Sequence, residues 1–158
     1  MSRPSLTTLA DDLQQLSYDL SRYYAVCDRF CVEELEVTAS QGYILLALPE
    51  TGNITMNDLS DRMKLANSTM TRMADQLIQK KMITRESDPL DRRVVRVQLT
   101  KRGQDVKARL KKALHDVFSQ ILLDIPIDER EPVVHSLEML NQSIVKTLKS
   151  CCAVEEGE

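Results

Sequence analysis

The chain has 158 residues, 42% of them hydrophobic, which is enough to build a buried core without metal or disulfide support. Its formal net charge of -3 argues against a uniformly basic surface for nucleic acid. The longest apolar run, Ile44 to Leu48, is far shorter than the ~20 residues of a membrane span. The N-terminal sequence also lacks the apolar core of a signal peptide. We therefore expect a cytoplasmic protein with no membrane partner, in which residues 1–158 form a single domain.

The first part of the chain predicts two helices. Apolar residues recur every three or four positions over residues 5–34, as in one long amphipathic helix. Thr38 and Gln41 have the spacing of a capping box, in which each side chain caps the backbone of the other residue. A second helix is therefore expected from Ala39 until Pro49, because proline cannot continue a helix.

Two shorter helices are expected next, with only a few residues between them. Thr55 has the chemistry of a helix N-cap, and the first short helix would cover residues 56–63. Asn67 or Ser68 is expected to cap the second, which would run to about Lys80. Its apolar residues share one side, so its hydroxyl, amide and arginine side chains would face solvent.

After the short helices the apolar pattern changes to a period of two. Residues 82–87 are a candidate strand, and the segment DPLDRR supplies a proline and two aspartates for a turn. In the second strand, VVRVQL, apolar and polar residues alternate, which gives one buried and one exposed face. Asp91 is expected to brace an arginine in this turn, while Arg92 or Arg93 projects from its tip.

Two long helices complete the chain. Thr100 is expected to cap a helix that runs to about Asp124, where the sequence IPID interrupts it. Asp128 and Glu131 again have capping-box spacing, and they predict a last helix to about Lys149. The predicted fold class is mainly α with a small β-hairpin.

Two short helices followed directly by a hairpin are typical of a winged helix-turn-helix, whose second helix enters the major groove of DNA. The charge distribution agrees, because residues 54–109 carry 13 Lys and Arg against 7 Asp and Glu, while the rest of the chain is acidic. We predict DNA contacts from side chains that can bond to base edges or phosphates. These side chains are Asn67, Ser68, Thr69, Thr71, Arg72 and Gln76 on the second short helix, with Arg92 and Arg93 on the hairpin.

Most of the chain resembles the MarR family of bacterial winged-helix transcription regulators. The family pattern has a Thr that opens a Leu-containing helix, a Ser/Thr-rich recognition helix, and an acidic-basic wing followed by LT..G. This sequence matches the pattern at Thr55, Leu59, Ser68, Thr69, Thr71, Leu77, Asp88, Asp91, Arg93, Leu99, Thr100 and Gly103. One departure is Met82, which stands where the family often has glycine. A left-handed cap on the preceding helix is therefore expected to form less easily.

This resemblance implies a winged helix-turn-helix lobe over residues 54–100 and a helical dimerisation region over residues 5–36 and 101–149. It also implies a homodimer that binds a pseudo-palindromic operator in double-stranded DNA, most members of the family being repressors. Release by a small-molecule effector or by oxidation is the implied form of regulation, and no cofactor is required.

Four cysteines form a second candidate site. Cys27 and Cys31 are four residues apart on the first helix and share one face, whereas Cys151 and Cys152 are adjacent. Neither pair has the spacing to close a disulfide on itself. The resemblance brings the first and last helices together, where four thiolates would suit zinc, an iron–sulfur cluster or a redox sensor. The alternative is a pair of semi-buried helix cysteines and an unstructured tail.

Other classes of function remain as alternatives. An enzyme is disfavoured, because Ser143 and Lys146 form only an S-x-x-K string that recurs by chance, and metalloprotease, nucleophile-elbow and phosphate-loop motifs are missing from the sequence. A winged-fold protein-interaction module without operator binding is a second alternative, and a small thiol-dependent metal or redox protein is a third. Gel-shift competition separates them, since a regulator prefers one operator and loses affinity steeply with salt.

Overall fold

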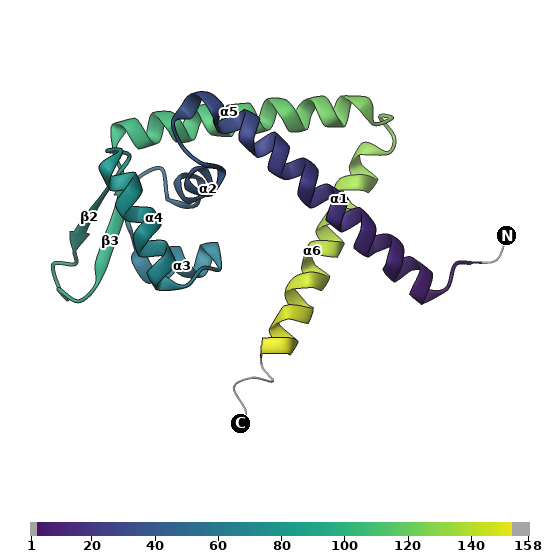
Figure 1. The fold of residues 1–158 in the computed structure, drawn as a ribbon, viewed down its shortest axis with the longest axis horizontal. Coiled ribbons are helices and arrows are strands. Elements are labelled where there is room, and N and C mark those ends of the chain that lie inside the picture. The colour runs from purple at the N-terminus through teal and green to yellow at the C-terminus, as the bar shows by residue number, and fades with distance from the viewer. Residues whose placement is uncertain (1–2, 153–158) are drawn as a thin grey trace. The chain divides into compact units, whose positions relative to one another are not determined.

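The computed structural model describes residues 3–152, and side chains from residue 3 to residue 150. The chain is mainly helical with a small antiparallel sheet, as predicted (Figure 1). The elements are α1 (Leu6–Val32), the 3-10 turn η1 (Glu33–Leu35), α2 (Ala39–Ala47), β1 (Ile54–Thr55), α3 (Met56–Met63), α4 (Asn67–Gln79), β2 (Ile83–Ser87), β3 (Val95–Leu99), α5 (Lys101–Asp124) and α6 (Arg130–Cys152). None of the helices in the described part is both long and apolar enough to cross a bilayer. The residues group into two compact units, Met1–His115 and Asp116–Glu158.

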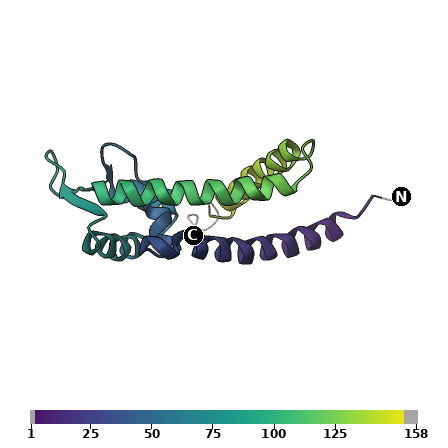
Figure 2. The ribbon, with the colours of Figure 1, turned by 90° about the horizontal axis from the view of Figure 1, so that it is seen from above.

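The first unit begins with α1, which Ser5 caps by accepting a hydrogen bond from the Thr8 amide at 3.2 Å. Helix α1 runs as one continuous element and extends past the winged lobe (Figure 2). The capping box that the sequence predicts at the start of α2 is confirmed. The Gln41 amide donates to Thr38 Oγ1, the Thr38 amide donates to Gln41 Oε1, and both distances are 3.2 Å.

The helix-turn-helix consists of α3 and α4. As predicted, Thr55 caps α3, with the Asp58 amide 3.0 Å from Thr55 Oγ1. The predicted cap of α4 is wrong: the N-cap residue is Ala66, whose side chain offers no acceptor, and both Asn67 and Ser68 already lie inside the helix. Their side chains are therefore not used to start α4 and face solvent.

Helix α4 ends in a left-handed turn, but the left-handed residue is Lys81 (φ 56°) and not Met82. The Lys81 amide donates to Ile78 O at 2.8 Å and the Met82 amide donates to Leu77 O at 3.0 Å, which is the bonding pattern of a Schellman cap. Met82 and Leu77 are both fully buried, as that cap favours. The expected difficulty at Met82 is thus resolved one residue earlier, by a lysine in a conformation that favours glycine.

The sheet has the order β1-β3-β2, with all pairs antiparallel. Strands β2 and β3 form the predicted hairpin, in which Ile83 pairs with Leu99 and Ser87 with Val95. The third strand, β1, was not predicted, because two residues are too short to show an alternating pattern. The face that carries Ile83 and Val97 packs into the core, where both side chains are fully buried.

Helix α5 starts where β3 ends. Thr100 caps it as predicted, by accepting from the Gly103 amide at 3.0 Å, and its hydroxyl also donates to Lys81 O at 2.7 Å. A Cβ atom on Gly103 would lie 1.9 Å from Met82 O, so only glycine allows the first turn of α5 to approach the backbone so closely. The LT..G motif therefore joins α5 to the root of the hairpin.

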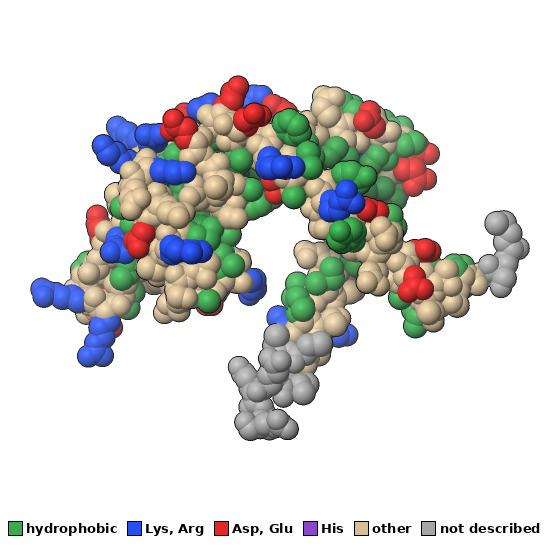
Figure 3. All heavy atoms as spheres, in the orientation of Figure 1, with side chains coloured by type: hydrophobic (Ala, Val, Ile, Leu, Met, Phe, Trp, Pro, Cys, Tyr) green, Lys and Arg blue, Asp and Glu red, His purple; other side chains and the backbone are tan. Residues whose placement is uncertain are grey.

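The second unit contains the end of α5 and α6. The corner between them is closed by Arg130, whose guanidinium donates to Ile125 O at 3.0 Å and to Leu123 O at 3.3 Å. Helix α6 begins at Arg130, two residues after the aspartate that was predicted to open it. Both units expose many large apolar side chains on their helices (Figure 3). In α1 these include Leu9, Leu13, Leu16, Tyr23 and Phe30, and in α6 Val134, Leu137, Met139, Ile144 and Leu148.

Candidate nucleic-acid interface

Helix α4 has one buried and one polar side. Met70, Ala74 and Leu77 point into the core and are almost fully buried. The residues predicted to contact DNA lie on the remaining surface, where Asn67, Ser68, Thr71, Arg72 and Gln76 are exposed and Thr69 is half-buried. The first turns of α4 thus present short hydrogen-bonding side chains and one arginine to solvent, as a helix that approaches a groove floor requires.

Two of these residues already make hydrogen bonds within the protein through their side chains. Thr71 donates its hydroxyl to the carbonyl of Asn67 at 2.8 Å, inside the same helix. Gln76 accepts a hydrogen bond from the buried Gln41 on α2, with 2.9 Å between Gln41 Nε2 and Gln76 Oε1. Gln76 therefore holds α4 against α2, a role that its polar surface position did not indicate.

Gln41 is the centre of a polar network at this helix crossing. Its side-chain oxygen accepts from Lys80 Nζ at 2.8 Å in addition to capping α2. The same ammonium group donates to the carbonyl of Glu36 at 2.6 Å, where the chain turns from η1 into α2. One amide and one lysine thus connect the C-terminal half of α4 to the chain that enters α2.

The hairpin turn between β2 and β3, here called the wing, is organised by Asp88. Its carboxylate accepts from the Leu90 amide at 2.7 Å and forms an ion pair with Arg96, and it is buried. These two contacts, the amide of Leu90 first, lower the pKa of Asp88 below its ordinary value. Asp91 braces an arginine as expected, but through its backbone: the carboxylate accepts from the Arg93 amide at 3.0 Å, and the guanidinium is left free to project.

Arg92 and Arg93 lie in this wing and are exposed. Within residues 3–150 the guanidinium groups of Arg72, Arg92 and Arg93 take part in no hydrogen bond or ion pair. Basic side chains project from the end of the hairpin, as Figure 3 shows at its left edge. Three arginines without internal partners are therefore presented by the same lobe, two from the wing and one from α4.

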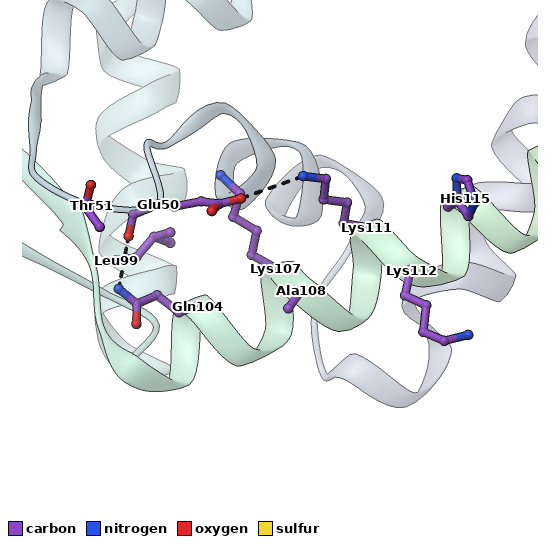
Figure 4. A pocket seen from close by; sticks show the side chains of 9 residues that line it. All are labelled: Glu50, Thr51, Leu99, Gln104, Lys107, Ala108, Lys111, Lys112 and His115. Atoms are coloured by element: carbon purple, nitrogen blue, oxygen red, sulfur yellow. Dashed lines mark hydrogen bonds and ion pairs between the residues drawn. The ribbon is translucent and has the colours of Figure 1, made fainter.

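A cleft of about 660 Å³ lies between the end of α2 and α5 (Figure 4). Lys107 stands in its wall, is buried, and donates to the carbonyls of Leu46 and Leu48 at the C-terminal end of α2. Burial lowers the pKa of Lys107. Lys111 and Glu50 face each other across the cleft at 3.7 Å, so this pocket carries both charges on a partly apolar wall.

The structure describes the side chains of two of the four cysteines in the predicted site. Cys31 is buried at the end of α1 and Cys27 is half-buried one turn earlier. Burial, followed by the nearby charge of Asp28, raises the pKa of the Cys31 thiol. The Asp28 carboxylate also accepts from the Tyr43 hydroxyl at 2.7 Å, and burial with this bond raises the pKa of Tyr43 to about 12. These contacts favour the neutral thiol, which is the unreactive form.

The metal-binding alternative stays a prediction. Among the residues that the structure describes, no three His, Cys, Asp or Glu side chains are placed to hold one metal ion. The side chains of Cys151 and Cys152 lie outside those residues, so the four-thiolate arrangement is not tested.

Comparison with known proteins decides the family. The model of the MarR family matches residues 37–95, which hold α2, the helix-turn-helix and the wing. The uncharacterised HTH-type transcriptional regulator YxaD of Bacillus subtilis is 34% identical over 105 residues, 65% of this chain and 73% of the relative. The chain belongs to the MarR family. It is thus classed with winged helix-turn-helix transcriptional regulators and not with enzymes, as predicted.

Three further likenesses extend this result. The transcriptional repressor MdtR of Bacillus subtilis is 37% identical over 76 residues, and the chain spans about half of its length (48%). The structure of reduced AbfR bound to DNA is similar with a TM-score of 0.72 and 25% identity, covering 90% of this chain and 96% of that one. Overoxidized AbfR bound to DNA is also similar, with a TM-score of 0.65 and 26% identity over 88% of this chain and 96% of that one.

The sequence does not indicate the roles of three side chains of this MarR protein. Gln41 was assigned only to its capping box, and its bond to α4 depends on how two helices cross. Lys107 was not considered, because nothing in a helix period distinguishes a buried lysine from an exposed one. Arg85 follows the apolar Ile83 by two residues, and this alternation could have indicated that Arg85 lies on the inward face of the sheet, as its pairing with Val97 shows.

Proposed function

We propose that the protein is a cytoplasmic, homodimeric repressor that binds a pseudo-palindromic operator through α4 and the wing. The observation that carries this proposal is the set of three arginines, Arg72, Arg92 and Arg93, exposed on one lobe without an ion pair in the described residues. An arginine without an internal partner can bind phosphate or enter a narrow minor groove without first breaking a contact. The similar structure of reduced AbfR is bound to DNA, which supports the same use of this fold.

In this proposal the eight predicted residues divide by position. Asn67, Ser68, Thr69 and Arg72 lie on the first turns of α4 and would reach base edges or nearby phosphates. Arg92 and Arg93 would contact the minor groove or the backbone beside it. Thr71 and Gln76, also in the predicted set, would act by holding α4 in place through the intramolecular hydrogen bonds that they already make.

The dimer is supported by the exposed apolar surface of the two units. Leucine, tyrosine and phenylalanine side chains cover α1, and valine, leucine and isoleucine side chains cover α6. Several large apolar side chains exposed along one helix mark an interaction site in soluble proteins. A second copy of the chain is the partner proposed for it, since two copies of α4 would then read two operator half-sites.

The test measures binding to duplexes from the DNA beside this gene, with a random duplex as competitor, over a salt series. We expect one duplex to be preferred and its affinity to fall steeply with salt. Arg93→Ala should weaken binding and lower the salt slope by roughly 2 for a dimer, at about 0.9 per lost phosphate contact. Arg29→Ala, an exposed arginine on α1, is the matched control and should bind as the wild type does.

Two outcomes would count against this function. If no duplex is preferred, the winged lobe is better explained as a protein-interaction module. If Thr69→Ala and Arg72→Ala leave the ranking of duplexes unchanged, α4 does not read the sequence. Size-exclusion chromatography with light scattering tests the dimer in the same samples.

Release from DNA is proposed to follow a small ligand or a thiol or metal signal. The cleft beside Lys107 and Lys111 supports a ligand with an acidic group and an apolar body. A panel of aromatic carboxylates should raise the melting temperature of the wild type more than that of Lys111→Met. The thiol signal predicts that oxidant or zinc changes DNA binding in the wild type and not after all four cysteines are replaced by serine.

A further inference from the structure

Arg85 breaks the apolar pattern of the inward face of the sheet. It pairs with Val97 in the ladder between β2 and β3, so it shares a face with Ile83, which is buried. The strand leaves the core at this point, and the Arg85 guanidinium reaches Asp75 on α4 at 2.9 Å. Both side chains remain about half exposed, at 52% and 47%. Strand β2 and helix α4 are thus joined by a solvent-accessible ion pair.

A cleft of about 270 Å³ opens beside this pair, between the start of α3, the middle of α4 and the wing. Its lining includes Arg85, Arg93, Thr55 and Thr71, and no acidic side chain. The Thr71 hydroxyl donates to the Asn67 carbonyl, whereas the Thr55 hydroxyl accepts from the Asp58 amide and keeps its own hydrogen to donate. The charged donors among the lining residues are the two arginines.

We propose that this cleft is a seat for one backbone phosphate of DNA, held between Arg85 and Arg93. The ligand class is a phosphodiester, because two guanidinium groups form planar, paired donors that match phosphate oxygens. The volume corresponds to roughly nine water molecules at about 30 Å³ each, which is ample for one such group. This inference rests on the proposed function and adds a residue, Arg85, and a place to it.

In the absence of DNA, Asp75 holds the Arg85 side chain of this seat in an ion pair. An exposed ion pair contributes little to folding, so its arginine can change partner at small cost. When a phosphate enters, Arg85 exchanges the carboxylate of Asp75 for phosphate oxygens, and no covalent bond changes. Asp75 therefore competes with DNA for Arg85, and it also keeps the guanidinium close to the cleft.

The pair gives a test in which the two partners act in opposite directions. In Arg85→Gln the seat loses one charge, so affinity for the preferred duplex and for the random duplex should fall by a similar factor, on the order of tenfold. The salt slope should decrease by roughly 1.8 for a dimer, at about 0.9 per phosphate. In Asp75→Asn the competitor is neutral, so both affinities should rise.

A purely structural role of the ion pair predicts a different result, because then both substitutions break the same contact and both weaken binding. The double variant distinguishes competition for Arg85 from a general effect of the removed negative charge. If Asp75 competes with DNA for Arg85, the gain in DNA affinity from Asp75→Asn should be smaller in the Arg85→Gln background. An equal gain in both backgrounds would overturn the seat, as would an unchanged salt slope in Arg85→Gln. Circular dichroism melting of each variant shows whether the lobe is folded. If Arg85→Gln does not fold, Asp75→Asn still tests the proposal, because its DNA affinity must rise.

The proposed function and this inference fail separately. If the wild type binds no duplex in a salt-dependent way, the regulator itself is refuted. If the wild type binds and Arg93→Ala weakens it while Arg85→Gln does not, the regulator stands and the phosphate seat is wrong.

Discussion

Gly103→Ala is the substitution that the structure predicts most sharply. The new Cβ atom would lie 1.9 Å from Met82 O and 2.9 Å from Met82 C, whereas real Cβ contacts are essentially never shorter than 3.0 Å. Both atoms belong to the backbone, so no side chain can rotate away. The first turn of α5 must move by at least about 1 Å, which is overpacking of the kind that destabilises folded cores.

The magnitude follows from three contributions. Overpacking costs about 1–3 kcal/mol, and the movement also stretches the bonds from the Thr100 amide (3.0 Å) and hydroxyl (3.1 Å) to Met82 O, at about 1 kcal/mol each. Alanine regains about 1 kcal/mol of helix propensity. The clash therefore outweighs the gain in helix propensity, and we expect the free energy of unfolding to fall by about 2–4 kcal/mol. For a chain of this size the melting temperature should fall by roughly 5–15 °C.

Gly42→Ala is the matched control. This glycine also lies inside a helix, and its new Cβ would be 2.7 Å from Leu110 Cδ2, the end of a flexible side chain that can change rotamer. We expect a change within about 1 kcal/mol, since the propensity gain offsets the repacking. Urea denaturation followed at 222 nm, at one fixed protein concentration, measures both. Equal stability of the two variants would refute the close approach of α5 to Met82.

Three further predictions concern single side chains. Lys81→Gly should stabilise the protein by about 1 kcal/mol in the same urea assay, because φ is 56° and glycine adopts this conformation without strain. A loss of stability would mean that the lysine side chain contributes more to folding than its strained backbone conformation costs. The depressed pKa of Asp88 predicts a contribution to stability that is complete above its ordinary pKa of 3.8 and is lost as pH falls through the lower folded value. An NMR titration should show this shift, and Arg96→Gln should reduce it. Because burial and Asp28 raise its pKa, Cys31 should be alkylated more slowly at neutral pH than the same cysteine in a short peptide. Fast alkylation would contradict this expectation and favour Cys31 as the reactive thiol of a sensor.

Features that depend on neighbouring residues could be predicted from the sequence. The caps at Thr38, Thr55 and Thr100 were correct because each is completed within three residues along the chain. The hairpin was correct because its alternation spans a whole strand. Strand β1 was missed because its two residues join the sheet only through pairing with β3, which is far away in sequence.

In the candidate interface, too, only the features that depend on neighbouring residues could be predicted from the sequence. Exposure of Arg92 and Arg93 follows from a polar turn, and the structure agrees. The contacts of Gln76 and Arg85 do not follow from any local pattern, because their partners lie on other elements. An amide on a helix surface is chemically the same whether it faces DNA or another helix, so the sequence cannot assign it.

The orientation of α4 therefore depends on polar contacts at two sides as well as on its apolar core. On one side Gln41 and Lys80 connect it to α2 and to the chain that enters α2. On the other side Asp75 connects it to β2 through Arg85. The first set is partly buried and satisfied in a network, so it is costly to break, whereas the second is solvent-exposed and exchanges cheaply. The helix is consequently held firmly where it meets α2 and adjustably where it meets the wing, which is the side on which the phosphate seat is proposed.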